Sequence, residues 1–230
     1  QGHVAPDQVE EELPRAVAAI RNQGVEVYMI TTSITNADDP TTEKILKTAS
    51  SLGIRHYRTG YYMYDDTISV EENLSKIKSQ LAKLAILNKK YAISGDYQNH
   101  SGSSYFGAPV WDLHGVLKQI NSPWIGSQYD INHATVEGAH TWPIGLKLLK
   151  SHIKSIDIKD FLWIRNEGKW QVEYVPLGAG MVDFTKYFGL LKQYALSVPI
   201  SIHYEYGLGG AEHGARNLTV SRDVVIAAMK

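Results

Sequence analysis

The chain has 230 residues, of which 23 are basic and 24 acidic, with a formal net charge of −1, and 43% are hydrophobic. This length and composition predict a single domain over residues 1–230 with one substantial core. A near-neutral chain with scattered Lys and Arg lacks the positive surface that binding to nucleic acid requires. Its apolar runs are far shorter than the roughly 18–20 residues that span a bilayer, so no membrane partner is expected. The absence of cysteine excludes thiolate metal sites, whereas compartment and oligomeric state remain open.

Helices and short apolar strands alternate along the first half of the chain. Apolar residues at helical spacing predict a helix over Val9–Ile20, capped by Asp7, and the apolar run Val25–Ile30 predicts a strand. Ser69 and Glu72 have the spacing of a capping box at the start of a long helix. The same reasoning predicts a helix at 40–52 and strands at 54–61 and 91–98.

The alternation continues through the second half. Helices are expected around 110–120 and 142–149, and strands at 124–130, 153–159 and 200–206. Asn166-Glu167-Gly168 is a turn signal between two alternating segments, which predicts a hairpin over 161–165 and 170–175. Asp183 is expected to cap a further helix, and a last helix is expected from about Thr219 to the end.

The predicted strands follow one another at intervals of roughly 30 residues, which is the period of a (β/α)8 TIM barrel. Six strands are visible, so this interpretation expects the first one or two βα units to precede Gln1, leaving the barrel N-terminally incomplete. An open doubly wound sheet is the alternative architecture. It is less favoured because no Gly-x-Gly-x-x-Gly follows an early strand.

Polar residues gather where each predicted strand ends. In a barrel the carboxyl ends of the strands converge on one mouth, so these residues predict a polar pocket. They are Thr31 and Thr32, Tyr61 and Tyr62, Gln98 to His100, Asp130 with His133, Asp157 with Lys159, and His203 with Glu205.

Five segments carry a resemblance to a known family. They are Tyr97–Gly102, Asp130–Ala134, Ile158–Asp160, Pro176–Phe184 and Ile202–Glu205. In this order, at the ends of a βα array, they resemble the xylose-isomerase-like TIM barrels, a superfamily of sugar phosphate isomerases and epimerases. The match covers most of the chain.

The resemblance implies a divalent metal held by a Glu, an Asp, a His and a Glu. By motif these positions are Gln98, Asp130, Asp157 and His203, of which only Asp130 is the usual residue. With Gln98, Asp130 and His203 as ligands, the mixed nitrogen and oxygen site would prefer Mn²⁺ or Zn²⁺ over Mg²⁺. The alternative is a metal-free site in which the ammonium of Lys159 stabilises the developing enediolate.

The resemblance also implies proton transfer next to a sugar carbonyl, as in an isomerase or epimerase. His133, Lys159 and Glu205 are the predicted catalytic residues. A keto-glycoside lyase that completes a β-elimination after the same proton removal is one alternative, and a non-catalytic sugar-binding barrel is another. The predicted substrate-binding residues are Tyr62, Asn99, His100 and Asp157.

The expected partner is a small carbohydrate. Gly178 and Gly180, and the pair Gly209-Gly210, could offer backbone N–H groups to a phosphate. Ordinary turns are the favoured interpretation, because Arg216 is the nearest basic residue to Gly209-Gly210. An unphosphorylated sugar or glycoside is therefore expected.

Overall fold

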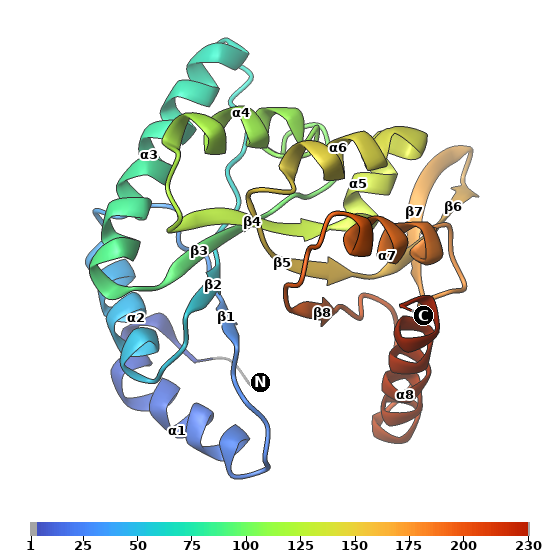
Figure 1. Cartoon of the computed structure of the whole chain (residues 1–230), viewed down its shortest axis with the longest axis horizontal. Helices are drawn as coiled ribbons and strands as arrows, with labels where there is room; N and C mark the ends of the chain where they lie inside the picture. The colour runs from blue at the N-terminus through green and yellow to red at the C-terminus, as the bar shows by residue number, and fades with distance from the viewer. Residues whose placement is uncertain (1–3, 230) are drawn as a thin grey trace. The chain divides into compact units, whose positions relative to one another are not determined.

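A computed structural model describes residues 4–229, which form two compact units (Figure 1). The first unit comprises the chain up to residue 98 together with 104–106 and 112–127. The second unit comprises 99–103, 107–111 and the chain from residue 128 onward. Strand β4 begins in the first unit and ends in the second, and each unit is described by itself below.

Parallel strands form the sheet of the first unit. Met29 of β1 lies opposite His56 of β2, which in turn lies opposite Ser94 of β3. The N–H of Gly95 donates to the carbonyl of Trp124 beside β4. These strands are β1 (Met29–Thr31), β2 (His56–Arg58), β3 (Ser94–Gln98) and the start of β4 (Ile125–Asp130). The helices are α1 (Val9–Arg21) after a 3-10 turn η1 (Pro6–Gln8), α2 (Pro40–Ser51), α3 (Val70–Tyr91) and α4 (Trp111–Ile120).

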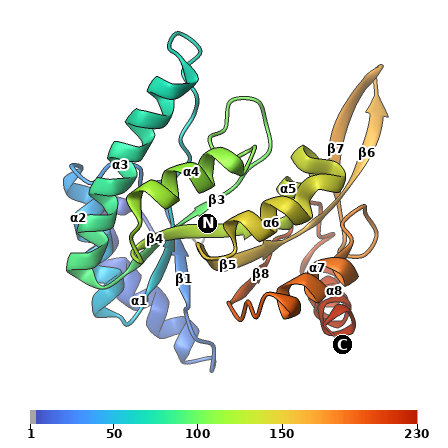
Figure 2. The same cartoon turned by 45° about the horizontal axis from the view of Figure 1, so that its top comes forward.

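Parallel strands also form the sheet of the second unit. Ile156 of β5 (Ile153–Ile158) lies opposite Ile200 of β8 (Ile200–Ile202). The antiparallel hairpin of β6 (Asp160–Asn166) and β7 (Lys169–Val175) stands apart from this sheet and extends beyond the helices of the unit (Figure 2). The helices are α5 (Ile131–Gly138), the 3-10 turn η2 (Ala139–Thr141), α6 (Trp142–Leu149), α7 (Phe184–Gln193) and α8 (Ala211–Ala228).

Each unit buries an apolar face of its helices against its strands. In the first unit Leu46 of α2 and Leu81 of α3 are fully buried, as is Tyr57 of β2. In the second, Leu146 of α6 and Tyr187 of α7 are fully buried. The stripes that the helical spacing predicted are therefore the faces that form the cores. Across residues 4–229, no helix combines the length and hydrophobicity that crossing a bilayer needs.

Most of the predicted turn and cap chemistry is confirmed. Ser69 and Glu72 form the capping box of α3, and the Asp39 and Asp183 side chains cap α2 and α7. The turn of the hairpin places Glu167 and Gly168 at φ 49° and 80°, as a two-residue turn of this kind requires. The predicted cap at Asp7 is wrong. That residue lies in η1, and Gln8 precedes α1 without a side-chain cap bond.

Several predicted element boundaries are also wrong. The first strand begins at Met29 rather than Val25, which is exposed, and the last strand ends at Ile202 rather than at 206. Helix α8 begins at Ala211, eight residues before the predicted start. Helix α5 was not predicted, because Asp130 ends β4 and caps the helix at once, so no loop separates the two periodic patterns.

Candidate functional site

Asp130 is the anchor of the polar cluster in the second unit. As the last residue of β4 it also caps α5, and its Oδ1 accepts the N–H groups of Asn132 and His133 at 2.9 and 3.2 Å. The two backbone bonds and full burial fix the carboxylate. Its other oxygen, Oδ2, lies 3.3 Å from Nζ of Lys159 and 3.7 Å from Nε2 of His133. A strand end that becomes a helix cap therefore holds a buried carboxylate beside two basic groups.

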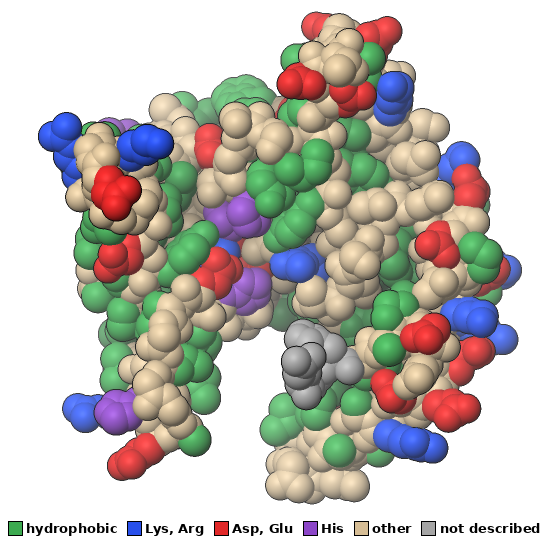
Figure 3. Space-filling model, turned by 180° about the vertical axis from the view of Figure 1, so that it is seen from behind, with side chains coloured by type: hydrophobic (Ala, Val, Ile, Leu, Met, Phe, Trp, Pro, Cys, Tyr) green, Lys and Arg blue, Asp and Glu red, His purple; other side chains and the backbone are tan. Residues whose placement is uncertain are grey.

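Two ion pairs connect the ends of β5 and β8. Nε2 of His203 lies 3.1 Å from Oδ1 of Asp157, and Nζ of Lys159 lies 2.6 Å from Oε1 of Glu205. The N–H of His203 donates to the carbonyl of Ile158, so the backbone ladder continues one residue past β8. Because Asp157 and Lys159 are two residues apart, as are His203 and Glu205, the pairs face the same side. Figure 3 shows histidine side chains next to acidic and basic ones on one face of the molecule.

A second layer of histidines borders Asp130. The rings of His100 and His133 lie 3.9 Å apart between centroids, and Nδ1 of His133 lies 2.8 Å from Oγ of Ser101. Nε2 of His133 is buried and has no hydrogen-bond partner among the described residues. Nδ1 of His100 contacts the carbonyl of Ser101 at 2.8 Å.

Burial and the neighbouring charges shift the pKa values of this cluster in different directions. Burial lowers the pKa of His133 to about 4, so its imidazole is neutral near pH 7. Burial opposes charge on His203 as well, but the bond to Asp157 raises its pKa above the usual value. For Asp130, burial is outweighed by His133 and Lys159, and its pKa is lowered.

The carboxyl groups of the two ion pairs are also shifted in opposite directions. Burial raises the pKa of Asp157 despite its bond to His203. Burial has the same tendency at Glu205, but the hydrogen bond from Lys159 outweighs it and lowers the pKa. Of the two carboxyl groups in these pairs, the more exposed one, that of Glu205, is therefore the one whose ionised form is favoured.

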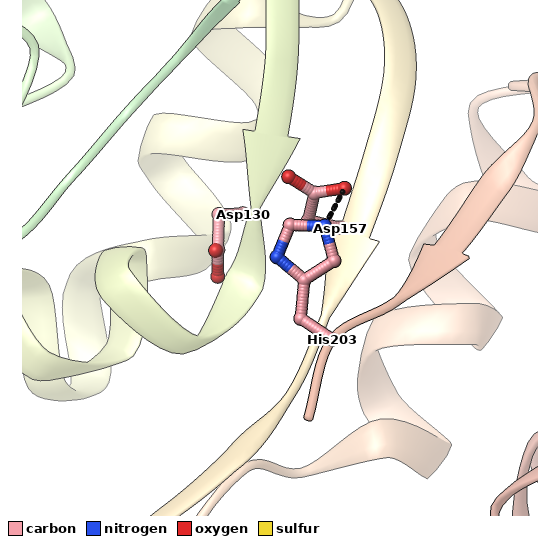
Figure 4. Close-up of side chains that lie close together, drawn as sticks. All are labelled: Asp130, Asp157 and His203. Atoms are coloured by element: carbon pink, nitrogen blue, oxygen red, sulfur yellow. Dashed lines mark ion pairs between the residues drawn. The ribbon is translucent and has the colours of Figure 1, made fainter. Parts of the chain in front are cut away.

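Asp130, Asp157 and His203 have the spacing of a metal site. One potential ligand atom from each lies within 4.8 Å of the others. Figure 4 shows the His203 ring between the two carboxylates, with Nε2 paired to Asp157 and the other ring nitrogen turned toward the side of Asp130. Oδ2 of Asp157 is buried without a hydrogen-bond partner among the described residues, which leaves a donor for a cation.

The charges of the cluster also fit a divalent ion. Three carboxylates and one ammonium carry a net charge of about −2 when His203 is neutral, so a divalent cation would balance them. Two carboxylate oxygens and one imidazole form a mixed donor set of the kind that suits Mn²⁺ or Zn²⁺. The residues present therefore fit a metal.

Three of the predicted site residues have other partners in the structure. Gln98 and Tyr62 belong to the first unit, where Oε1 of Gln98 accepts bonds from Arg58 and Tyr61. The hydroxyl of Tyr62 donates to the carbonyl of Thr35 at 2.6 Å. The metal role of Gln98 and the substrate role of Tyr62 stay predictions.

Asn99 belongs to the second unit, and both ends of its amide bond the backbone of Asp130. Its Nδ2 donates to the Asp130 carbonyl at 3.0 Å, and its Oδ1 accepts the Asp130 N–H at 2.8 Å. The side chain thus replaces a pair of sheet hydrogen bonds and fixes Asp130. A substrate contact from Asn99 stays a prediction.

Asp160 ends one of the five segments of the resemblance, but no role was predicted for its side chain. Its buried carboxylate accepts four backbone N–H groups, from Phe161, Gly178, Gly180 and Val182, at 2.9 to 3.1 Å. The glycine N–H groups are therefore engaged within the protein, as the turn interpretation expected. A side chain at Gly180 would collide with the Asp160 carboxylate. The sequence pattern that could have indicated this arrangement is an Asp directly after the β5 segment, followed about twenty residues later by Gly178 and Gly180.

Comparison with protein families identifies the fold. The model of the family described as "Xylose isomerase-like TIM barrel" matches residues 2–220. The chain belongs to this family. The match confirms the predicted TIM-barrel class and the resemblance. Among curated protein sequences, none matches this chain.

Solved structures share the fold at low sequence identity. A xylose isomerase domain protein from Planctomyces limnophilus is 17% identical with a TM-score of 0.76, over 98% of this chain and 86% of that one. A 3-keto-D-glucoside 4-epimerase from E. coli, in its apo form, is 11% identical with a TM-score of 0.72, over 98% of this chain and 87% of that one. A xylose isomerase-like TIM barrel protein from Mycobacterium smegmatis, in complex with magnesium, is 13% identical with a TM-score of 0.69, over 100% and 81%.

Proposed function

We propose that this protein is a sugar isomerase or epimerase that moves a proton next to the carbonyl of a small carbohydrate. The observation that carries the proposal is the charged cluster at the ends of β4, β5 and β8, in which Lys159 lies between Asp130 and Glu205. An ordinary core does not bury two carboxylates and a lysine together, because each unpaired charge would be costly. Groups arranged in this way are suited to holding and exchanging protons.

Glu205 is the proposed base. Its side chain is 37% exposed, whereas that of Lys159 is 2% exposed. The bond from Lys159 lowers the pKa of Glu205, so its carboxylate is ionised near pH 7 and able to accept a proton from the substrate carbon. Glu205 is thus both charged and reachable.

Lys159 and His133 have supporting roles in this proposal. The ammonium of Lys159 orients the Glu205 carboxylate and offers positive charge for the oxyanion that forms when the carbon loses its proton. The neutral imidazole of His133, packed beside His100 and bonded to Ser101, lies 3.7 Å from Asp130. It is a candidate for the group that donates or relays a proton.

Asp130, Asp157 and His203 would hold a divalent cation, with Mn²⁺ or Zn²⁺ favoured over Mg²⁺. When bound, such an ion supplies Lewis-acid polarisation of a sugar oxygen. In this assignment Asp157 is a ligand rather than the substrate-binding residue that the sequence predicted.

The comparison with the 3-keto-D-glucoside 4-epimerase supports a carbohydrate as the substrate, because that protein acts on a keto sugar and shares this fold. A lyase would begin with the same proton removal and then expel the substituent on the neighbouring carbon. A binding module would retain the sugar without removing the proton. The three alternatives therefore differ in isotope exchange and products.

The test is proton NMR of candidate ketoses and keto-glycosides incubated with the full-length protein in D₂O. We expect deuterium to replace the proton on the carbon next to the carbonyl, with an isomer or epimer as the product. Exchange accompanied by an unsaturated product and a released alcohol would assign the lyase. Binding of the same sugars without any exchange would reject catalysis in favour of a sugar-binding module.

A further inference from the structure

The hairpin β6–β7 has one aromatic face. Its register pairs Phe161 with Tyr174, Trp163 with Val172 and Arg165 with Trp170. Directly paired residues of an antiparallel ladder lie on the same face, so these six side chains form one surface, which we call the aromatic strip. The opposite face carries three aliphatic residues, Leu162, Ile164 and Val175, and otherwise polar ones.

The strip is buried at its base and exposed toward its tip. Phe161 is buried, and its ring packs edge-on against that of Trp163 with the centroids 6.2 Å apart. Trp163 is 40% exposed and Trp170 is 67% exposed. The two indoles are diagonal neighbours on one face of the hairpin, about 7–8 Å apart. Large apolar side chains that are exposed together on a protruding element often mark a binding surface.

The base of the strip is continuous with the candidate site. Nζ of Lys159 lies 5.3 Å from the centroid of the Tyr174 ring, and the same ammonium binds Glu205. The four N–H bonds to Asp160, together with the bond from the Met181 N–H to the Phe161 carbonyl, fix the start of β6. The buried end of the strip is therefore held in place close to Glu205, the proposed base.

We propose that the aromatic strip binds the second sugar ring of a glycoside whose first ring lies at Glu205. This inference rests on the proposed function and narrows its substrate to glycosides or oligosaccharides. From the rung of Tyr174 to that of Trp170 is four residues, or about 14 Å along the strand, which is farther than a single sugar ring reaches. The C–H face of a pyranose packs on an indole ring, while its hydroxyl groups remain at the edge.

The one charged residue of the strip agrees with this occupant. Arg165 shares the rung of Trp170 and therefore lies on the same face of the hairpin. Its guanidinium N–H groups can donate to the hydroxyl groups of a stacked sugar. If the second sugar ring is held by stacking and by hydrogen bonds at its edge, the glycoside is oriented so that its first ring, which carries the keto group, lies at Glu205.

The test compares cellobiose with glucose by ligand-observed NMR titration of the full-length protein. We expect cellobiose to bind about tenfold more tightly, since stacking on one aromatic residue is worth roughly a factor of ten. Trp163→Ala and Trp170→Ala should each reduce this preference to about twofold or less, and Trp170→Phe should retain most of it. Trp111→Ala is the matched control, because Trp111 is 60% exposed on α4 and should leave the preference unchanged.

Three results would overturn the proposal. They are equal affinities for the two sugars in the wild type, the same loss in Trp111→Ala, and a Trp170→Ala protein that sediments as a monomer while the wild type sediments as a dimer. The last would assign the strip to a second copy of the chain. Glu205→Gln should keep the preference for cellobiose. If the preference depends on Trp163 and Trp170 but no sugar exchanges its proton, the strip proposal stands and the proposed function fails.

Discussion

The polar strand ends of the two units are built differently. In the first unit, Arg58 and Tyr61 bond the side-chain carbonyl oxygen of Gln98, which is an uncharged amide. In the second unit, Lys159 lies between two carboxylates and His203 pairs with a third. Strand-end polarity alone does not distinguish these cases. Proton transfer needs groups that change charge, and the second unit provides them.

The largest expected effect concerns the buried charges. Lys159→Met would leave Asp130 buried beside no ammonium, and we expect unfolding to become easier by about 3–5 kcal/mol, as for other broken buried pairs. Urea denaturation would measure the change. Lys90→Met is the matched control in the first unit, because Lys90 forms an exposed pair with Glu43 and its loss should leave the midpoint unchanged. Equal shifts of the urea midpoint in the two variants would contradict the claim that the buried ion pair of the second unit stabilises the fold more than the exposed pair of the first.

The next effect is a pH dependence of stability. The pKa of His133 is about 4 in the folded protein, against an unfolded value near 6.5, so between these values the unfolded state binds more protons. Stability should therefore rise with pH across this window and fall on acidification, by about 3 kcal/mol at most from this group. His133→Asn should flatten the difference, measured by urea midpoints with EDTA present. His140→Asn, in the exposed turn η2, should retain the wild-type slope.

A metal titration compares the two units directly. Asp157→Asn should weaken Mn²⁺ binding by about 100-fold or more, since loss of a ligand exceeds the effect of losing a residue that supports one. Gln98→Leu should change the affinity by less than about threefold, because the Gln98 oxygen already accepts two bonds. Isothermal titration calorimetry would measure both. A loss in Gln98→Leu as large as that in Asp157→Asn would restore Gln98 as a ligand.

The sequence predicted the alternation of helices and strands because apolar spacing and caps are local signals. It did not predict α5, whose cap is the last residue of a strand, or the early start of α8, where no side chain caps the helix. The site could be predicted as far as its strand ends. Asp130, Lys159, His203 and Glu205 lie together, as the motifs indicated.

The sequence could not predict which side chains of the site pair with each other. The pairing of Lys159 with Glu205, and of Asp157 with His203, depends on the register of β5 and β8. The engagement of Asn99 with backbone and of Asp160 with four N–H groups depends on loops that no sequence periodicity describes.

The most direct test of the central claim is the rate of deuterium exchange in Glu205→Gln. An amide at this position keeps the shape of the side chain but cannot accept the proton, and we expect the rate to fall by about 10²–10⁴-fold. Glu173→Gln, an exposed substitution on the other face of the hairpin, is the control and should exchange at the wild-type rate. Wild-type exchange in Glu205→Gln would contradict the account, because Glu205 would then not be the base.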